Sequence, residues 1–314
     1  MIEITRAGES LVEALRLQLQ AFGEADRLAR IEQLLDSERR QIVSLDNCLV
    51  CRRGTRIAGV LLLVNQSDGT VYVWPAETLA GLHPEDDVNI RRALYLEAVR
   101  VVDSPKNWIG QSLLETDQGE QSRELAENGF PRLTDLVFMN RPVSAFSDVA
   151  LQSEASSSEI WCSDSFDEAV NGADFASLVE QTYESTCDCP ELNGSRDGWE
   201  SLESHRHSGS HRPDLWRLFR HEGQPAGLLL LTEHPPDAVW EVVYFGVAPQ
   251  FRGMGFGQRI LEAGIDLAQR RGVLEIVLAV DVRNTPAMRL YEDLKFEPFD
   301  RRVVHARIRK KSSL

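Results

Sequence analysis

The sequence lacks any continuous apolar run of roughly eighteen residues, the length that a membrane-spanning helix needs. Its first residues, Met1–Arg6, lack the basic and apolar regions of a secretory signal peptide. Basic residues are scarce beside acidic ones, 34 against 49, and the net charge is −15. Because nucleic-acid binding needs clustered Lys and Arg, we expect a cytoplasmic protein that binds neither a membrane nor nucleic acid. The negative charge is compatible with a cationic amine as substrate.

Cysteine is also sparse, with 5 residues in a chain of 314. In a cytoplasmic protein these cysteines are expected to be reduced rather than paired in disulfides. Cys48 and Cys51 lie in an apolar run that predicts a strand, so burial is favoured over redox chemistry. Cys187-x-Cys189 is followed by three histidines between residues 205 and 211, but this spacing fits no standard zinc site. We therefore expect no metal.

Two common phosphate-binding motifs are absent: Gly-Lys-Ser/Thr for a nucleoside triphosphate and G-x-G-x-x-G for a dinucleotide. What is present is Tyr244–Leu261, where an apolar strand enters a loop with Gly253, Gly255 and Gly257 and then an amphipathic helix. Glycines let the backbone approach a ligand closely and adopt positive φ. The free N–H groups at the start of the helix favour an anion, most naturally a phosphate. Arg252 adds a positive charge beside them.

Arg252-x-x-Gly255-x-Gly257, preceded by Val247-x-Pro249, resembles the acyl-CoA pyrophosphate loop of the GNAT superfamily of N-acetyltransferases. The resemblance implies acetyl-CoA as the co-substrate and no metal. It also implies that the loop, the strand before it and one asparagine after it contact the coenzyme: Phe245, Gly246, Val247, Ala248, Arg252, Gly253, Met254, Gly255, Phe256, Gly257, Gln258 and Asn284.

An acetyltransferase needs a proton acceptor for its amine. Removing the proton of an alkyl ammonium at pH 7 costs roughly 4.6 kcal/mol, because its pKa lies about three and a half units above neutrality. Glu241 is the candidate base: it lies on the predicted strand Val239–Val247, and its position resembles that of the catalytic glutamate in GNAT members. Alternation with a period of two predicts that Glu241, Val243, Phe245 and Val247 share one face. The alternative is a strand-end glutamate that faces solvent.

The leaving thiolate needs a proton source, and Tyr291 is the candidate acid. It ends the segment Asn284–Tyr291, which resembles the family's N-x-x-A-x-x-L-Y, whose tyrosine lies near the coenzyme sulfur. For Tyr291 the alternative is core packing. Asn284 either caps the predicted helix or contacts the coenzyme, and both alternatives stay open. Lys295 stands where the family usually has glycine, which is expected to alter the turn into the last strand.

The two halves of the chain share an order of helices and strands, and short segments recur. Ala58–Leu62 recurs as Ala226–Leu230 at an offset of 168 (226 − 58), and Asn128–Phe130 aligns with Leu294–Phe296 at an offset of 166 (296 − 130). The nearly equal offsets indicate duplication. The element order resembles that of the GNAT fold. This implies an α/β (α+β) protein of two tandem GNAT folds, each with a mixed, mostly antiparallel central sheet flanked by helices.

A Ser-rich polar segment without periodicity has the composition of a linker. It divides the chain into a first domain, a linker and a second domain: 1–145, 146–158 and 159–314. The first half carries three acidic residues, Glu85–Asp87, where a phosphate loop would lie, and Leu125 aligns with Tyr291. Because carboxylates repel a pyrophosphate, we expect a degenerate first domain that does not bind coenzyme A.

Together these features predict an acetyl-CoA-dependent N-acetyltransferase that transfers an acetyl group to a primary amine of a small molecule or peptide. The amine would attack the thioester directly. The alternative is a non-catalytic acyl-CoA-binding sensor or interaction module. The polar segment Tyr183–Pro213, predicted to be a loop, is expected to cover the acceptor site. The chain is expected to be a monomer or a homodimer.

Overall fold

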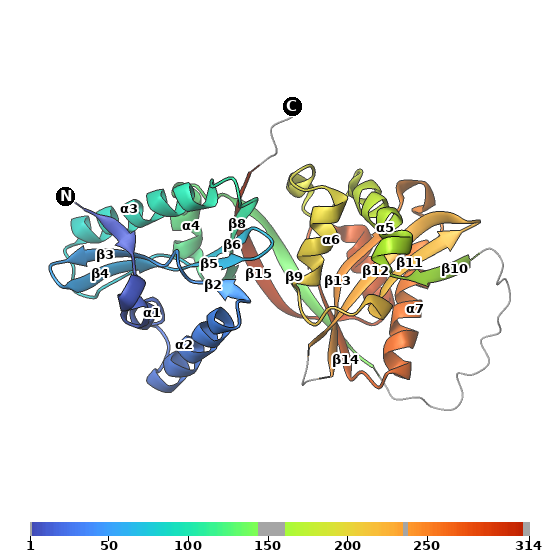
Figure 1. Ribbon diagram of the computed structural model, residues 1–314, viewed down its shortest axis with the longest axis horizontal. Coiled ribbons are helices and arrows are strands. Elements are labelled where there is room, and N and C mark those ends of the chain that lie inside the picture. The colour runs from blue at the N-terminus through green and yellow to red at the C-terminus, as the bar shows by residue number, and fades with distance from the viewer. Residues whose placement is uncertain (1, 144–160, 235–237, 310–314) are drawn as a thin grey trace. The chain divides into compact units, whose positions relative to one another are not determined.

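The chain divides into two compact units (Figure 1). Unit 1 is Met1–Leu133 with Val303–Leu314, and unit 2 is Thr134–Arg302. The computed structural model describes residues 2–143, 161–234 and 238–309.

Unit 1 contains four helices and most of the strands of the first half of the chain. The helices are α1 (Leu11–Gln18), α2 (Glu24–Arg39), α3 (Pro84–Val102) and α4 (Gly119–Glu127). The strands up to residue 115 are β1 (Ile4–Arg6), β2 (Val43–Ser44), β3 (Leu49–Arg53), β4 (Arg56–Leu61), β5 (Leu63–Gln66), β6 (Thr70–Val73), β7 (Glu77–Thr78) and β8 (Ile109–Glu115). The strands β1, β3, β4 and β7 pair antiparallel, as do β2, β5 and β6, whereas β6 pairs parallel with β8.

The core of unit 1 follows from helical periodicity. In α3 the buried residues recur at every fourth position, Ile90, Leu94, Ala98 and Val102, so one stripe of the helix packs on the strands. A second cluster joins the buried side of α1, including Leu15, to β4 and β5. The strands of unit 1 are therefore covered by helices, as the predicted fold class requires.

Unit 2 contains the central sheet that carries the site. Its helices are α5 (Glu168–Tyr183), α6 (Gly198–Arg206), α7 (Phe256–Arg270) and α8 (Thr285–Asp293). Its strands from residue 161 are β10 (Trp161–Ser165), β11 (Trp216–His221), β12 (Gln224–His234), β13 (Val239–Val247) and β14 (Glu275–Asp281). The order is β10-β11-β12-β13-β14, with antiparallel pairs except for the parallel pair β13–β14.

Helices cover both faces of this sheet. Ile260, Leu261 and Ile265 of α7 pack with Leu229 and Leu231 of β12 in one cluster. On the other face, α5 packs on β12. The cluster there contains Phe175, Leu178 and Val179 of α5 with Leu228 and Leu230 of β12. Alternate residues of one strand therefore enter different cores, as expected for a strand buried on both faces.

Each unit takes a strand from the other half of the chain. The strand β9 (Arg132–Pro142), which ends the first half, pairs antiparallel with β14 in unit 2. The last strand, β15 (Glu297–Ile308), ends in unit 1. There Nε2 of His305 and Oγ of Ser122 share a hydrogen bond of 2.7 Å. The sequence-based limits 1–145 and 159–314 follow the order of the chain, whereas these units exchange their last strands.

One helix was missed in the sequence. The segment after Tyr183 was predicted to be a loop, but it contains α6. Its start carries a capping box, in which Asp197 and Glu200 each accept a backbone N–H of the other. The Asp-x-x-Glu spacing was the available signal. The predicted linker, 146–158, lies outside the described residues.

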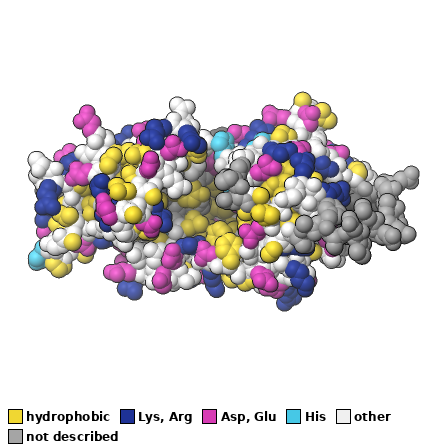
Figure 2. Space-filling view, turned by 90° about the horizontal axis from the view of Figure 1, so that it is seen from below, with side chains coloured by type: hydrophobic (Ala, Val, Ile, Leu, Met, Phe, Trp, Pro, Cys, Tyr) yellow, Lys and Arg dark blue, Asp and Glu magenta, His cyan; other side chains and the backbone are white. Residues whose placement is uncertain are grey.

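None of the described helices is both long and apolar enough to cross a membrane. On the face drawn in Figure 2, acidic and basic side chains lie interspersed rather than gathered by sign. The surface shown there therefore does not present the concentrated positive charge that nucleic-acid binding uses.

Candidate functional site

A cavity of about 590 Å³ opens in unit 2. Five segments line it: the loop after α5, the helix α6, the end of β13, the glycine loop with the first turn of α7, and α8. They meet because the loops that leave parallel strands emerge at the same edge of a sheet. Most of the predicted coenzyme contacts line this cavity: Phe245, Gly246, Val247, Arg252, Gly253, Gly255, Phe256, Gly257, Gln258 and Asn284.

Two predicted coenzyme contacts do not line the cavity. Ala248 is fully buried, and its backbone N–H donates to the carbonyl of Ala226 at 2.9 Å. Met254 lies in the loop with its side chain 61% exposed.

The glycine loop has the backbone conformation that the sequence predicted. Gly253 and Gly255 have φ of +74° and +80°, and a Cβ at either would meet no atom within 4 Å. Glycine is therefore required here by the positive φ, and not by a lack of room for a side chain. Gly255 is the N-cap of α7, and the N–H groups of Phe256–Gln258 begin the helix without intrahelical acceptors. These N–H groups and the helix dipole form an anion site.

Arg252 braces the glycine loop. Its guanidinium donates to three backbone carbonyls, those of Val247 at 3.0 Å, Glu184 at 2.7 Å and Thr182 at 2.8 Å. The arginine therefore ties the loop to the end of α5 while it keeps a positive charge beside the anion site.

The strand β13 carries a β-bulge that changes which residues share a face. Its register with β12 shifts between Leu230 and Leu231, which leaves Val243 as the extra residue. An extra residue moves all later side chains to the opposite face. The prediction that Glu241 shares a face with Phe245 is therefore wrong.

The bulge also separates β13 from β14. The two strands pair only from Val239↔Glu275 to Val242↔Leu278. From Val243 to Val247, β13 has no pairing with β14 among the described residues, so this edge keeps backbone groups for a ligand. An amide-rich chain can add to such an edge as an extra strand.

Tyr291 lies in the cavity wall on α8. Its side chain is buried, with its ring 6.4 Å from that of Phe245 and 5.8 Å from that of Phe296. Burial, and secondarily the charge of Asp188, raise the pKa of the hydroxyl well above its usual range. The hydroxyl is therefore protonated at neutral pH and able to donate a proton.

Asn284 caps its helix and lies where it could also contact the coenzyme, which stays a prediction. Its side chain caps α8 by accepting the N–H of Ala287 at 3.3 Å, and the residue also lines the cavity.

Glu241 is not among the described residues that line the cavity. Its carboxylate oxygen Oε2 lies 2.7 Å from Nε2 of His234, and its side chain is 32% exposed. The structure therefore brings Tyr291, but not Glu241, to the cavity together with the glycine loop. The base role of Glu241 stays a prediction.

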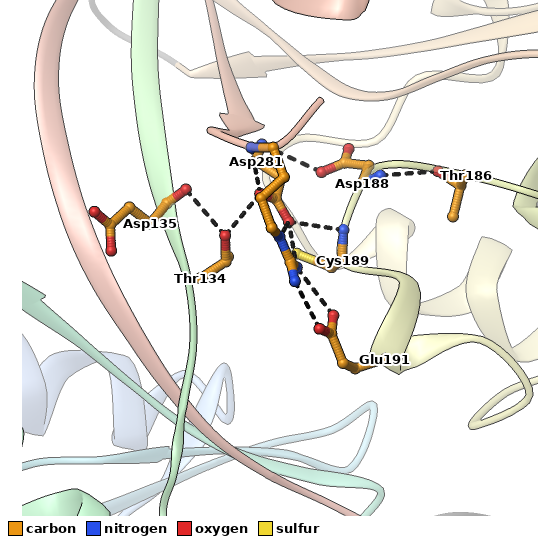
Figure 3. Close-up of polar contacts among 8 residues, drawn as sticks. Thr134, Asp135, Thr186, Asp188, Cys189, Glu191 and Asp281 are labelled. Atoms are coloured by element: carbon orange, nitrogen blue, oxygen red, sulfur yellow. Dashed lines mark hydrogen bonds and ion pairs between the residues drawn. The ribbon is translucent and has the colours of Figure 1, made fainter. Parts of the chain in front are cut away.

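The loop after α5 carries residues that the sequence did not single out. The backbone N–H of Asp281, at the end of β14, donates to Asp188 Oδ1 at 3.2 Å (Figure 3). The N–H of Cys189 donates back to Asp281 Oδ2 at 3.0 Å. Cys189 adopts a φ of +42°, which is unusual for a residue with a side chain. These contacts fix the loop to the sheet.

Asp281 and Arg283 complete this connection. Asp281 is fully buried, and burial alone would raise its pKa, but hydrogen bonds from Arg283, Thr134 and the Cys189 N–H hold the pKa at about 2. Arg283 donates to both carboxylate oxygens of Glu191 in the loop, at 2.6 and 2.9 Å. A permanently ionised Asp281 thus anchors the loop through an arginine. No local pattern links these residues, so the sequence offered no signal for them.

The cysteines and histidines weighed for zinc do not gather. Among the described residues, the one group of three potential ligand side chains within 4.8 Å of one another is Asp188, Cys189 and Asp281, without any of the histidines. Burial raises the pKa of the Cys189 thiol well above its usual range, and the nearby carboxylates raise it further.

Residues 179–296 match the acetyltransferase (GNAT) family. The chain is 28% identical to a mycothiol acetyltransferase of Kocuria rhizophila over 279 residues, and the match covers 80% of each protein. It is 31% identical to a mycothiol acetyltransferase of an Arthrobacter species over 130 residues, 33% of this chain and 40% of that protein.

Solved structures of similar fold cover the chain from end to end. An N-acetyltransferase from Sphaerobacter thermophilus has a TM-score of 0.59 at 16% identity, covering 99% of this chain and 97% of that one. A tandem GNAT protein from the clavulanic acid biosynthesis pathway has a TM-score of 0.53 at 15% identity and covers 100% of both. The predicted fold class, two GNAT folds in tandem, is confirmed.

Proposed function

Because residues 179–296 match the GNAT family of acetyltransferases, we propose that the chain transfers an acetyl group from acetyl-CoA to a primary amine. The observation that carries the proposal is the convergence of three features on one cavity: the glycine loop, the open edge of β13 and the hydroxyl of Tyr291. The glycine loop suits a phosphate, and the open edge of β13 suits an amide-rich arm. The hydroxyl of Tyr291 suits a leaving thiolate.

The residues that would hold acetyl-CoA can be inferred from the backbone groups that they offer to a ligand. The N–H groups at the start of α7 suit the pyrophosphate. The edge of β13 from Val243 to Val247 suits the pantetheine arm, because its unpaired backbone groups match the arm's amides. Fixing the thioester beside an amine can lower the barrier by several kcal/mol, since the reacting atoms no longer have to meet by diffusion.

Tyr291 is proposed to donate the proton to the leaving thiolate. Its burial in the cavity wall keeps the hydroxyl protonated at neutral pH, so it can hydrogen-bond to the departing thiolate and pass it a proton that water then replaces. The amine must lose a proton before it attacks, and the sequence proposes Glu241 for this step. Because Glu241 lies outside the cavity lining, it could take this proton only through a water.

A small-molecule acceptor is favoured over a peptide. The curated relatives are named for one compound, mycothiol, and not for a protein substrate. The cavity also has limited room, about 590 Å³ for coenzyme arm and acceptor together. We therefore propose a small molecule with a primary amine as the acceptor.

The test is turnover of the full-length chain with acetyl-CoA and a panel of primary amines: an aminoalkane, glucosamine, an amino acid amide and a short peptide. We expect release of free thiol and acetylation of at least one small amine, read by a thiol-reactive dye and by mass spectrometry. Binding of coenzyme A without turnover of any amine would instead support a non-catalytic sensor.

A further inference from the structure

Asp188 is the one carboxylate among the described residues that line the cavity. The other titratable side chains there are tyrosines, cysteines, arginines and a histidine: Tyr183, Tyr244, Tyr291, Cys187, Cys189, Arg196, Arg252 and His205. An alkyl ammonium that enters the cavity therefore meets a single negative side chain.

The carboxylate of Asp188 is held with one oxygen available. Its Oδ1 accepts the N–H of Asp281, and its own backbone N–H donates to Thr186 Oγ1 at 3.0 Å (Figure 3). Its Oδ2 accepts no hydrogen bond from any residue that the structure describes. The loop on which it sits is fixed by Cys189 and Arg283. The Asp188 carboxylate therefore has a fixed orientation, and its Oδ2 is available to accept a hydrogen bond or a proton.

Asp188 also lines the same cavity as Tyr291, the proposed proton donor. Its charge acts on the hydroxyl groups of Tyr291 and Tyr244, both of which line the same cavity. Glu241 does not line it and is hydrogen-bonded to His234.

We infer that Asp188 takes the proton from the acceptor's ammonium, an assignment that rests on the proposed acetyltransferase function. The N–H bond breaks and an O–H bond forms on Asp188, which later gives this proton to water. The electron pair left on nitrogen attacks the thioester carbon, the C–N bond forms and the C–S bond breaks. The nitrogen loses its second proton to water, Tyr291 gives its proton to the thiolate, and the resulting phenolate takes a proton back from water, so the products are an amide and a thiol.

The surroundings of Asp188 suit this role. The pKa of Asp188 is raised to about 6, mainly by burial and also by the charge of Asp281, while the hydrogen bond from the Asp281 N–H and the charge of Arg283 oppose the rise. The other titratable groups that face it are Cys189 and the hydroxyls of Tyr183, Tyr244 and Tyr291. A base with a raised pKa that is still ionised at pH 7 is well matched to proton transfer near neutrality.

The test compares wild type with Asp188→Asn, Asp188→Glu and Glu241→Gln, using the panel amine that wild type acetylates best. Glu184→Gln is the matched control, because it removes an exposed carboxylate from the same loop outside the cavity lining. At pH 7 we expect Asp188→Asn to lose about 100-fold or more in kcat/KM, with partial recovery in Asp188→Glu. Coenzyme A affinity and melting temperature should be unchanged in Asp188→Asn, which shows that the variant is folded.

The pH profile separates a proton acceptor from a structural residue. In wild type, kcat/KM should rise through the pKa of Asp188, about 6, and stay level until the amine itself titrates near pH 10. In Asp188→Asn it should climb about tenfold per pH unit between pH 7 and 9, because only the free amine reacts.

A level profile in Asp188→Asn, or a profile that climbs in Glu241→Gln instead, would overturn the assignment and leave the acetyltransferase proposal intact. Failure of wild type to acetylate any amine would overturn both.

Discussion

Tyr291 and Leu125 occupy equivalent positions in the two units. The carbonyl of Tyr291 accepts the N–H of Phe296 at 2.9 Å, and the carbonyl of Leu125 accepts the N–H of Phe130 at 3.0 Å. Both pairs span five residues and stand at one offset, 291 − 125 = 166 and 296 − 130 = 166. The turn at the end of the helix is thus repeated, whereas the hydroxyl is present in unit 2 and replaced by an aliphatic side chain in unit 1.

Replacing Tyr291 with Phe should lower kcat by about 100-fold, because the thiolate would leave without its proton donor. The affinity for coenzyme A should not change, since the ring and its packing are kept. Steady-state kinetics and calorimetry measure the two quantities. Tyr183→Phe is the matched control, because it removes another hydroxyl from the cavity wall. Equal losses in both variants would contradict the assigned role.

Replacing Gly255 with Ala should weaken coenzyme A binding at least tenfold, because a Cβ disfavours the positive φ that presents the N–H groups of α7. Gly272→Ala is the matched control at the other end of α7. Gly272 also has a positive φ, +70°, and open space around it. Both variants should lose about 1–2 kcal/mol of stability, but Gly272→Ala should bind coenzyme A as wild type does.

Calorimetry of the full chain with coenzyme A should give one site per chain. In unit 1 the first turn of α3 carries Glu85, Asp86 and Asp87, and Asp86 pairs with Arg53 at 2.6 Å. These carboxylates take the place that a phosphate would need and repel it. A second site of similar affinity would show that unit 1 binds the coenzyme in another way.

Replacing Lys295 with Gly should stabilise unit 2 by about 1 kcal/mol. Lys295 has a φ of +66°, the left-handed conformation that a residue with a Cβ adopts at a cost of about 1–2 kcal/mol. Gly129 holds the equivalent turn in unit 1 with a φ of +96°. Urea unfolding should show a higher midpoint with an unchanged slope. Gly129→Ala should move the midpoint down, and an opposite shift in either variant would contradict the argument.

The stability of unit 1 should fall as the pH rises from about 5 to 7. Burial raises the pKa of Glu124 to about 7, Arg91 at 3.5 Å opposes the rise, and Asp87 and Glu77 add to it. Between its unfolded pKa of about 4.3 and the folded value, Glu124 keeps a proton in the folded state that the unfolded chain has released. Raising the pH through this window therefore favours unfolding.

Glu124→Gln should remove this pH dependence, because the amide does not titrate. Thermal melts at pH 5, 6, 7 and 8 measure it. Glu127→Gln, an exposed position on the same helix, should keep the wild-type slope.

What local pattern determines was predictable from the sequence. The limits of β13, Val239–Val247, agree with the structure, because an apolar run between turn signals defines a strand. The glycine loop was predictable for a similar reason, because positions with positive φ are usually occupied by glycine and glycine is visible in the sequence. Tyr291 and Asn284 line the cavity because their helix, α8, follows β14, and β14 lies beside the strand β13 that leads into the glycine loop.

What depends on distant pairing was not predictable. The bulge at Val243 exists only relative to the neighbouring strand β12, and it moved Glu241 to the other face. Asp188 reaches the cavity because its loop is hydrogen-bonded to Asp281, 93 residues later in the chain. No hydrophobic period records which sheet a terminal strand will join, so the exchange of β9 and β15 also left no signal.

That exchange has a consequence for synthesis on the ribosome. Unit 1 holds residues 1–133, but it also contains Val303–Ile308, which are made only after the whole of unit 2. Domains commonly fold in order as they emerge. Here unit 1 has to wait with an open sheet edge until residues 303–308 have been made, whereas the strand β9 of unit 2 is made before the other strands of that unit. The half that is made first is therefore completed last.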